Sequence, residues 1–188
     1  MENIEEIIKG CKKGNNDAQR ALYNLFQRKM YSVCLRYSSN YAEAEDIAQE
    51  GFVKVFKNVH QFKNTGPIEA WIRRIMVNTA LEKHKKTSPL YIAEDVYEYV
   101  NDLNYDEIIS NISAKDIIMV IQELSPQYKL VFNLYEMEGY AHAEIAKMLG
   151  ISENTSRSNL LRAKAILQRK ILKNFPYCKG NKTYNNVK

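Results

Sequence analysis

The sequence predicts an all-α protein made of two small helical domains joined by an acidic linker. Glycine and proline, which interrupt helices, are scarce among the 188 residues, at seven and four. Apolar residues recur at spacings of three and four through most of the chain, as on the buried face of an amphipathic helix. One stretch between the two halves differs in composition. We therefore expect domains at 1–86 and 114–175, a linker at 87–113 and a disordered tail at 176–188.

The first domain is predicted to contain four helices. They cover residues 4–12, 16–39, 42–59 and 68–86. Asn16 or Asp17 can cap the second helix, and Pro67 suits the first turn of the fourth. The core faces of the second and third helices are expected to carry Leu22, Leu25, Phe26, Met30, Val33, Cys34, Ile47, Ala48, Phe52, Val55, Phe56 and Val59.

The linker at 87–113 is distinguished by charge of a single sign. Its acidic residues are Glu94, Asp95, Glu98, Asp102, Asp106 and Glu107, and it contains no lysine or arginine. Such a segment either contacts a basic surface or extends by self-repulsion. A helix is expected to begin near Asp106.

The second domain is predicted to end in a helix-turn-helix. Before it come an amphipathic segment, 113–124, and a helix that Ser125 caps and Gly139 ends. Gly150 then permits a tight turn after the helix that starts near Glu144, and Ser152 can cap the last helix.

The last helix has one apolar face and several polar ones. Leu160, Ala163 and Leu167 can face the core, whereas Lys164, Arg169, Lys170 and Lys173 would suit phosphates. The side chains expected to reach base edges are Asn154, Arg157, Ser158, Asn159 and Arg162. A solvated basic helix is the alternative, but the glycine turn and the cap favour DNA binding.

Composition and motifs exclude several other classes of protein. The net charge is +5, a modest excess that only mildly favours a nucleic-acid partner. Cys11, Cys34 and Cys178 lie far apart and form no CxxC pair, so no zinc ribbon or disulfide framework is expected. The charged N-terminus is no signal peptide and no run is long enough to span a membrane, so we expect a cytoplasmic protein. No catalytic motif, cofactor loop or metal-ligand spacing is present, so we expect neither an enzyme nor a cofactor or metal.

Specific motifs carry a resemblance to one family. The first half contains D-x-x-Q-E (Asp46, Gln49, Glu50) and W-[IL]-x-x-I-x-x-N (residues 71–78). The second half contains L-[SP]-P-x-x-x-x-V-F (residues 124–132), G-Y-x-x-x-E-I-A-x-x-L-G-I-S (residues 139–152) and R-A-K (residues 162–164). In this order, the motifs resemble regions 2 and 4 of bacterial sigma factors of the extracytoplasmic-function branch.

The resemblance implies a role for each surface. Asp46, Gln49 and Glu50 would bind core RNA polymerase. The last helix would read the −35 element of promoter DNA, and the first domain would hold the melted −10 element. Phe62 would offer an apolar or stacking wall to an unstacked base. The polar residues implied for the −10 element are Lys63, Asn64, Thr65, Arg73, Arg74 and Asn78.

The resemblance also implies a regulatory partner, and the sequence departs from the family pattern at three positions. An anti-sigma factor, often membrane-bound, would hold such a protein inactive. Ser156 stands where the family usually has an apolar residue, Asn159 where a basic one is common, and Leu161 where an aromatic one is common. A stand-alone helix-turn-helix regulator that needs no polymerase is the alternative function.

Overall fold

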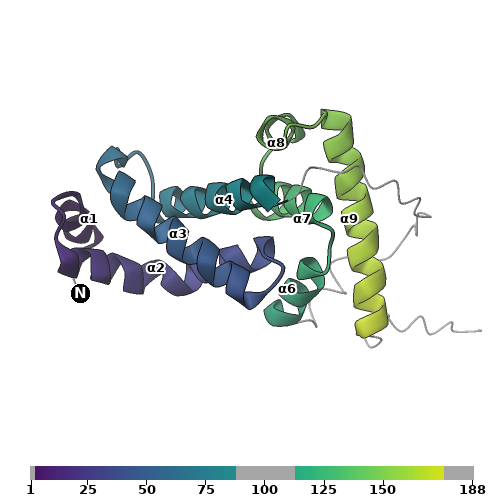
Figure 1. Ribbon diagram of the computed structural model, residues 1–188, viewed down its shortest axis with the longest axis horizontal. Helices are drawn as coiled ribbons and strands as arrows, with labels where there is room; N and C mark the ends of the chain where they lie inside the picture. The colour runs from purple at the N-terminus through teal and green to yellow at the C-terminus, as the bar shows by residue number, and fades with distance from the viewer. Residues whose placement is uncertain (1–2, 88–112, 176–188) are drawn as a thin grey trace, which may run out of the picture. The chain divides into compact units, whose positions relative to one another are not determined.

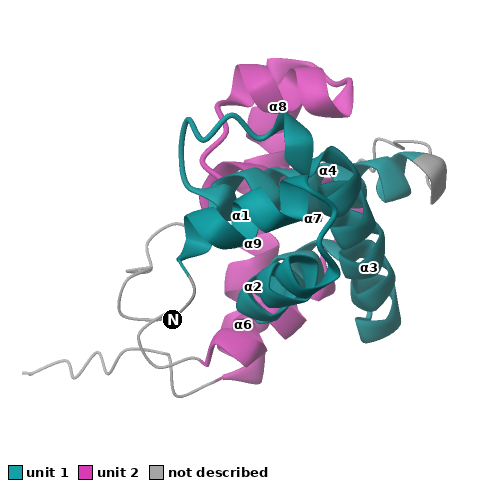
Figure 2. Cartoon of the chain, turned by 90° about the vertical axis from the view of Figure 1, so that its left-hand side faces the viewer, with its two compact units in different colours: residues 1–91 teal, residues 92–188 magenta. Residues whose placement is uncertain are grey.

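The computed structural model describes residues 3–87 and 113–175, which form helices and no strand. The chain divides into two compact units, residues 1–91 and 92–188 (Figures 1 and 2). The predicted linker lies outside the described residues except for Thr87, which ends a helix, and Ser113, which caps the next one. The expected helix near Asp106, the tail and Cys178 also lie outside them.

Within residues 3–87 the chain forms four α-helices, as predicted. They are α1 (Ile4–Lys12), α2 (Asn16–Tyr37), α3 (Tyr41–Asn58) and α4 (Ile68–Thr87), with a 3-10 turn, η1 (Val59–Gln61), after α3. Asparagine side chains cap the first three: Asn15 Oδ1 accepts from the Ala18 amide at 2.9 Å, and Asn40 Oδ1 from the Glu43 amide at 2.8 Å. The expectation of a cap at Asn16 or Asp17 is therefore wrong, because Asn15 caps α2 and both expected residues lie inside its first turn.

The core of the first unit forms where α2, α3 and α4 pack together. Leu22, Met30, Ile47, Ile72 and Met76 are buried in it. The expectation that Leu25 lines this core is wrong, since its side chain is 53% exposed. Successive helical residues differ by about 100°, so Leu22 and Phe26 face the core while Leu25 falls beyond the edge of the apolar stripe. Phe56 is only half-buried and stacks on Phe52.

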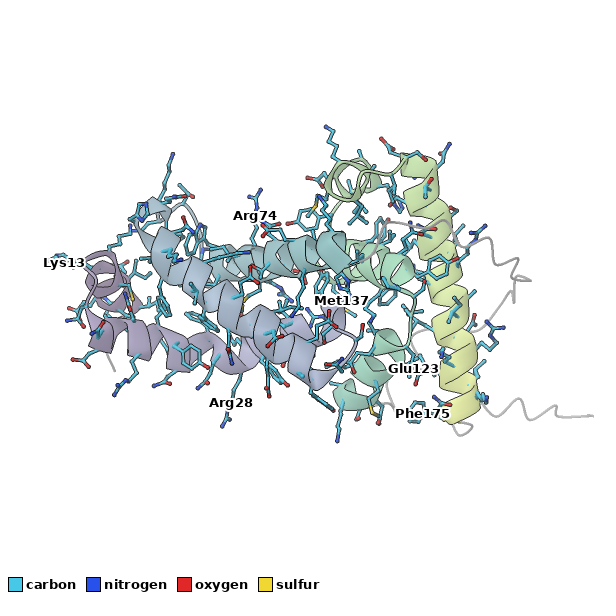
Figure 3. All side chains as sticks on the ribbon, in the orientation of Figure 1. Lys13, Arg28, Arg74, Glu123, Met137 and Phe175 are labelled. Carbon is cyan, nitrogen blue, oxygen red and sulfur yellow. The ribbon has the colours of Figure 1, made fainter. Side chains whose placement is uncertain are left out.

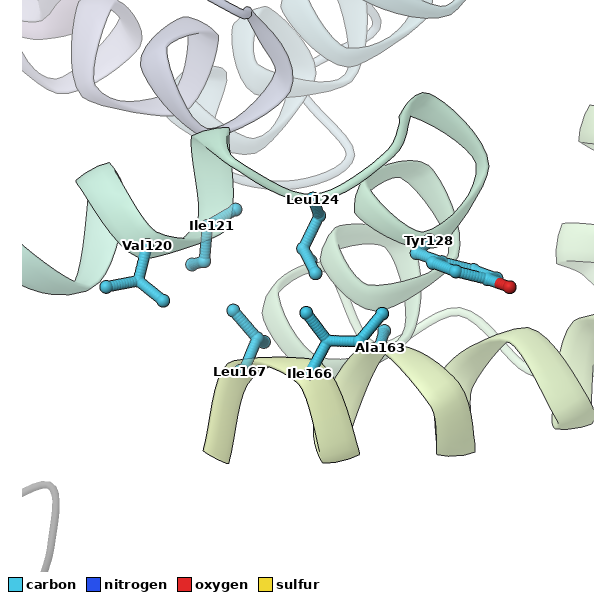
Figure 4. Packing of buried hydrophobic residues seen from close by; sticks show 7 residues of the cluster. All are labelled: Val120, Ile121, Leu124, Tyr128, Ala163, Ile166 and Leu167. Atoms are coloured by element: carbon cyan, nitrogen blue, oxygen red, sulfur yellow. The ribbon is translucent and has the colours of Figure 1, made fainter. Parts of the chain in front are cut away.

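The second unit is built around one long helix. Its elements are α6 (Ala114–Gln122), α7 (Pro126–Phe132), the π-helical turn η2 (Asn133–Met137), α8 (His142–Leu149) and α9 (Glu153–Asn174). Pro126 opens α7 as predicted, but the Ser125 side chain makes no capping hydrogen bond. Figure 4 shows the apolar cluster between the α6–α7 segment and α9; its members are Val120, Ile121, Leu124, Tyr128, Ala163, Ile166 and Leu167.

Two cysteines belong to the core of the first unit and are free thiols. Burial raises the pKa of the Cys34 thiol to about 12 and also raises the pKa of Cys11. Since the thiolate is the reactive form, neither side chain is a reactive nucleophile at neutral pH.

A glycine sets how closely α3 approaches α4. A methyl group added at Gly51 would lie 2.2 Å from the Sδ atom of Met76, whose side chain is fully buried. Only a residue without a side chain fits this contact unless the Met76 side chain moves.

We predict that Gly51→Ala lowers the free energy of unfolding of the first unit by about 1–2 kcal/mol, because the cost of overpacking exceeds the roughly 1 kcal/mol that alanine gains over glycine in a helix. Urea unfolding monitored by circular dichroism measures the loss. Gly66→Ala is the control, because nothing lies within 4 Å of the added methyl group there. Equal stability of the two variants would contradict the packing argument.

Candidate functional site

The helix-turn-helix forms as the sequence predicts. Gly150 adopts a left-handed conformation with φ of 70°, and its amide donates to the Ala146 carbonyl at 2.9 Å. Ser152 caps α9, since its Oγ accepts from the Thr155 amide at 3.0 Å. The Glu144 carboxylate accepts from the Ala141 amide at 2.9 Å and fixes the start of α8. Both helices of the pair therefore have defined ends at the turn.

The polar faces of α9 are divided between solvent and core. Asn154 and Arg157 are exposed, and Ser158 and Arg162 are half-buried. The expectation that Asn159 faces outward is wrong: its side chain is 4% exposed, and its Nδ2 atom is buried without a hydrogen-bond partner. The reason is helical spacing, because Asn159 precedes Ala163 by four residues and so shares its buried face.

The buried stripe of α9 also includes Ser156, which has no exposed surface. Its Oγ atom lies 2.9 Å from Nδ1 of His142 on α8. The His142 ring stacks on Tyr135 of η2, with centroids 4.5 Å apart and planes 21° apart. Sequence reasoning missed this contact, because it joins two separate helices and no spacing in the sequence marks it.

The electrostatic surroundings of His142 favour its neutral form. Burial lowers the pKa of His142, the Arg157 charge lowers it further, and the Glu153 carboxylate opposes both. Arg157 itself pairs with Glu153 at 3.4 Å, and its side chain remains 59% exposed. The guanidinium therefore stands near the start of α9, held only by a weak surface pair.

Two of the lysines expected to meet phosphates are already paired. Lys164 bonds to Glu136 at 2.6 Å, and Lys170 pairs with Glu123. Lys173 is exposed. The basic surface of α9 is thus partly neutralised within its own unit, and the lysines form a weaker phosphate-binding face than their number indicates.

In the first unit, the predicted polymerase-binding residues lie on the solvent face of α3. Asp46, Gln49 and Glu50 are all exposed. Asp46 bonds to Lys83 of α4 at 3.1 Å, and its side chain is 70% exposed. Glu50 pairs with Lys54 at 2.9 Å, and Lys54 also reaches Glu82 of α4 at 2.8 Å. Side-chain hydrogen bonds to these two carboxylates outweigh burial and raise the pKa of Lys54.

A recess of about 360 Å³ lies beside this face, between α2 and α3. Tyr23, Tyr31 and Phe52 line it together with Gln49. The Tyr23 and Phe52 rings meet edge to face, with centroids 4.8 Å apart. Sequence reasoning missed the tyrosines, because a single exposed aromatic residue on a helix has no characteristic spacing.

The turn before α4 presents polar side chains on a buried aromatic base. Lys63, Asn64 and Thr65 are exposed, and Asn64 has a left-handed φ of 54°. The expectation that Phe62 offers a stacking wall is wrong for the free chain, because Phe62 is only 6% exposed and packs against Trp71 at 5.6 Å. An apolar ring gains more from that contact than from water, so it faces inward.

The following helix, α4, also carries exposed polar residues. Arg74 and Asn78 are exposed and lie four residues apart, hence on one face of α4, and Arg73 is half-buried. Figure 3 shows Arg74 projecting from this helix. Within residues 3–87 and 113–175, no cluster of three potential metal ligands occurs, and no helix has the length and apolarity of a membrane span.

Comparison with known families explains this arrangement. The family description "Sigma-70 region 2" matches residues 22–89, and "Sigma-70, region 4" matches residues 114–167. The two matches together cover more than half of the chain and fall in the order of the two helical units. The chain belongs to the sigma-70 family. As a sigma factor, it directs transcription initiation.

Relatives of this sigma factor belong to the extracytoplasmic-function (ECF) branch. It is 27% identical over 180 residues to the ECF RNA polymerase sigma factor SigW of Bacillus subtilis, covering 89% of this chain and 96% of the relative. It is 25% identical over 179 residues to the ECF RNA polymerase sigma-E factor of Haemophilus influenzae, covering 89% and 94%. The solved sigma factor RpoE of Bartonella quintana, in complex with the anti-sigma factor NepR, shares the fold at a TM-score of 0.50 and 20% identity, covering 82% of this chain and 96% of that chain.

We predict that His142 titrates below its ordinary value of 6.5 in the native sigma factor. The unfolded chain then binds this proton more readily than the folded one, so stability falls as the pH decreases through about 6.5. Titration of the imidazole signals by NMR measures the pKa. Arg157→Ala should raise it and Glu153→Gln should lower it, because the two charges act in opposite directions. A native pKa above 6.5 would contradict the assignment.

Proposed function

We propose that this sigma factor uses three exposed faces on separate elements for three steps of initiation. The face of α3 formed by Asp46, Gln49 and Glu50 binds core RNA polymerase. Residues 63–65, with Arg73, Arg74 and Asn78 of α4, hold the melted −10 strand. The start of α9 reads the −35 element. One observation carries the proposal. The face before and on α4 and the face at the start of α9 each bring hydrogen-bond donors and acceptors to a helix end. The polymerase-binding face lies on α3, which packs against α4.

Binding to polymerase requires exchange of ion pairs on α3. Asp46 and Glu50 pair with lysines of their own unit, with side chains 70% and 50% exposed. Exposed pairs of this kind contribute at most about 1 kcal/mol each, so a basic partner displaces the lysines at little cost. The resemblance indicates the basic clamp helices of the largest polymerase subunit as that partner. The recess beside Gln49 offers aromatic contact area next to the charged face.

Holding the melted strand requires compensation for lost stacking, a few kcal/mol for each extruded base. Asn64 and Thr65 supply donors and acceptors for a base edge, and Lys63, Arg74 and Asn78 suit the strand's backbone. Phe62 supports this loop from below through its contact with Trp71. The Phe62–Trp71 pair thus holds the loop in place, and the polar residues 63–65 contact the DNA strand.

Reading the −35 element falls to Asn154, Arg157, Ser158 and Arg162. An arginine can donate two hydrogen bonds to a guanine edge in the major groove, and an asparagine can pair similarly with adenine. Asn159 is left out of this set because it is buried. Its place in the stripe instead makes it part of the packing between α9 and the rest of the unit.

A regulator follows from the same family resemblance. An anti-sigma factor, in many cases membrane-bound, would bind the sigma factor in the cytoplasm. It would cover the DNA-binding and polymerase-binding surfaces of one or both units and so keep the protein inactive. Co-purification of the chain with the product of a neighbouring gene that encodes a membrane span tests this partner.

We predict that the double substitution Asp46→Ala and Gln49→Ala lowers the affinity for core polymerase roughly tenfold or more, equivalent to about 1.4 kcal/mol for each factor of ten. Fluorescence anisotropy of the labelled sigma factor with core polymerase measures the affinity, and run-off transcription measures its consequence. Glu6→Ala, on the exposed face of α1, is the control.

Two results would count against this role. Loss of helicity in the double variant would mark Asp46 and Gln49 as structural residues. Tight binding of the wild-type chain to promoter DNA, without any binding to core polymerase, would favour a stand-alone regulator.

We predict that Arg157→Ala removes about 1–3 kcal/mol of discrimination at one position of the −35 element. Arg157→Lys keeps the charge but not the forked geometry, so it should retain the salt dependence and still lose discrimination. Binding of holoenzyme to duplexes with single base changes, at several salt concentrations, measures both. A uniform loss across all sequences would assign Arg157 to a phosphate.

A further inference from the structure

We infer that Lys12, the last residue of α1, is a positioning residue for the loop that holds the −10 strand. Its Nζ atom donates a hydrogen bond of 2.7 Å to the carbonyl oxygen of Phe62, fifty residues away in the sequence. The same ammonium lies 5.8 Å from the centroid of the Phe62 ring. The inference rests on the proposed function of residues 63–65.

The bond completes a set of attachments at one residue. The Phe62 amide donates to the Val59 carbonyl at 3.1 Å and closes η1. The Phe62 ring packs against Trp71 at the start of α4. With Lys12 on its carbonyl, Phe62 is held through its amide, its ring and its carbonyl. The exposed residues 63–65 begin immediately after this fixed point.

The position of Lys12 is itself well determined. Ile7, Ile8 and Cys11 are buried and anchor α1 to the unit, and Asn3 caps its start. This helix precedes the segment matched by sigma-70 region 2, which begins at residue 22. The family match therefore assigns it no part in DNA binding, while the structure joins it to the first residue of the loop.

The attachment matters more for the loop than for overall stability. Because the Lys12 side chain is exposed, water competes with the Phe62 carbonyl for its ammonium and reduces what the hydrogen bond contributes to folding. The loop, however, contains Asn64 in a left-handed conformation that non-glycine residues adopt at a cost. Fixing the peptide two residues earlier reduces the conformational freedom that is lost when the loop binds a base.

The test compares Lys12→Met with Lys13→Met in the full chain. Lys13 is the exposed C-cap of the same helix, so its substitution removes the same charge from the same helix end (Figure 3). Holoenzyme binding to a single-stranded −10 oligonucleotide should weaken roughly fivefold to tenfold for Lys12→Met and stay unchanged for Lys13→Met. Core affinity and binding to a −35 duplex should not change in either variant. Lys12→Arg should restore part of the −10 binding.

Two further readouts distinguish positioning from direct contact and from misfolding. The only tryptophan of the chain, Trp71, touches Phe62, so acrylamide quenching of its fluorescence in the free protein should increase for Lys12→Met alone. The salt dependence of −10 binding should keep its slope, whereas loss of a phosphate contact would reduce that slope by about one. Identical quenching and −10 binding in the two methionine variants, or a reduced slope for Lys12→Met, would overturn the inference. If Asn64→Ala and Thr65→Ala leave −10 binding unchanged, it is the proposed function that fails, while the quenching result still tests the Lys12 attachment.

Discussion

The packing of α9 against α6, α7 and α8 is the constraint on which the second unit depends. In the proposed function the same helix fills the core of its unit and presents a surface to DNA, and helical phase separates the two roles. Leu160, Ala163 and Leu167 lie inside, while Asn154 and Arg157 lie outside. The width of the buried stripe decides whether a residue between these faces is buried or exposed, and Ser156 and Asn159 are buried within it. The surface left for reading bases is therefore narrower than a polar helix of this length indicates.

Charged side chains at the surface are also shared between two roles, since they pair within the free chain and are proposed to bind partners. Several residues that the sequence assigned to DNA or polymerase are paired in the free chain with other side chains of their own unit, as Asp46 is with Lys83 and Lys164 is with Glu136. Both pairs lie at the surface and are partly open to water, so each contributes little to stability and leaves its side chains available to a partner. A partner that binds more strongly can displace either residue of such a pair and bind the other.

The sequence predicted what depends on local patterns. The helices of residues 3–87, the left-handed Gly150 and the Ser152 cap are all local, since each is fixed by residues within one or two turns. The errors concern boundaries of faces. Leu25 is exposed, Asn159 is buried, and Phe62 turns inward because the positions of neighbouring helices decide which edge of a stripe is covered. The contacts from His142 to Ser156 and from Lys12 to Phe62 join separate elements, and no spacing in the sequence marks them.

The close approach at Gly51 and Met76 has a mechanical meaning for the first unit. One helix of the pair, α3, carries the surface assigned to the polymerase, and the other, α4, carries part of the surface assigned to the opened promoter. Their separation is fixed where the Gly51 backbone meets the fully buried Met76, so in the proposed function this contact sets the distance between the polymerase-binding surface and the promoter-binding surface. A change at that contact would shift one surface against the other. Transcription would then start poorly from a protein whose two surfaces are individually intact.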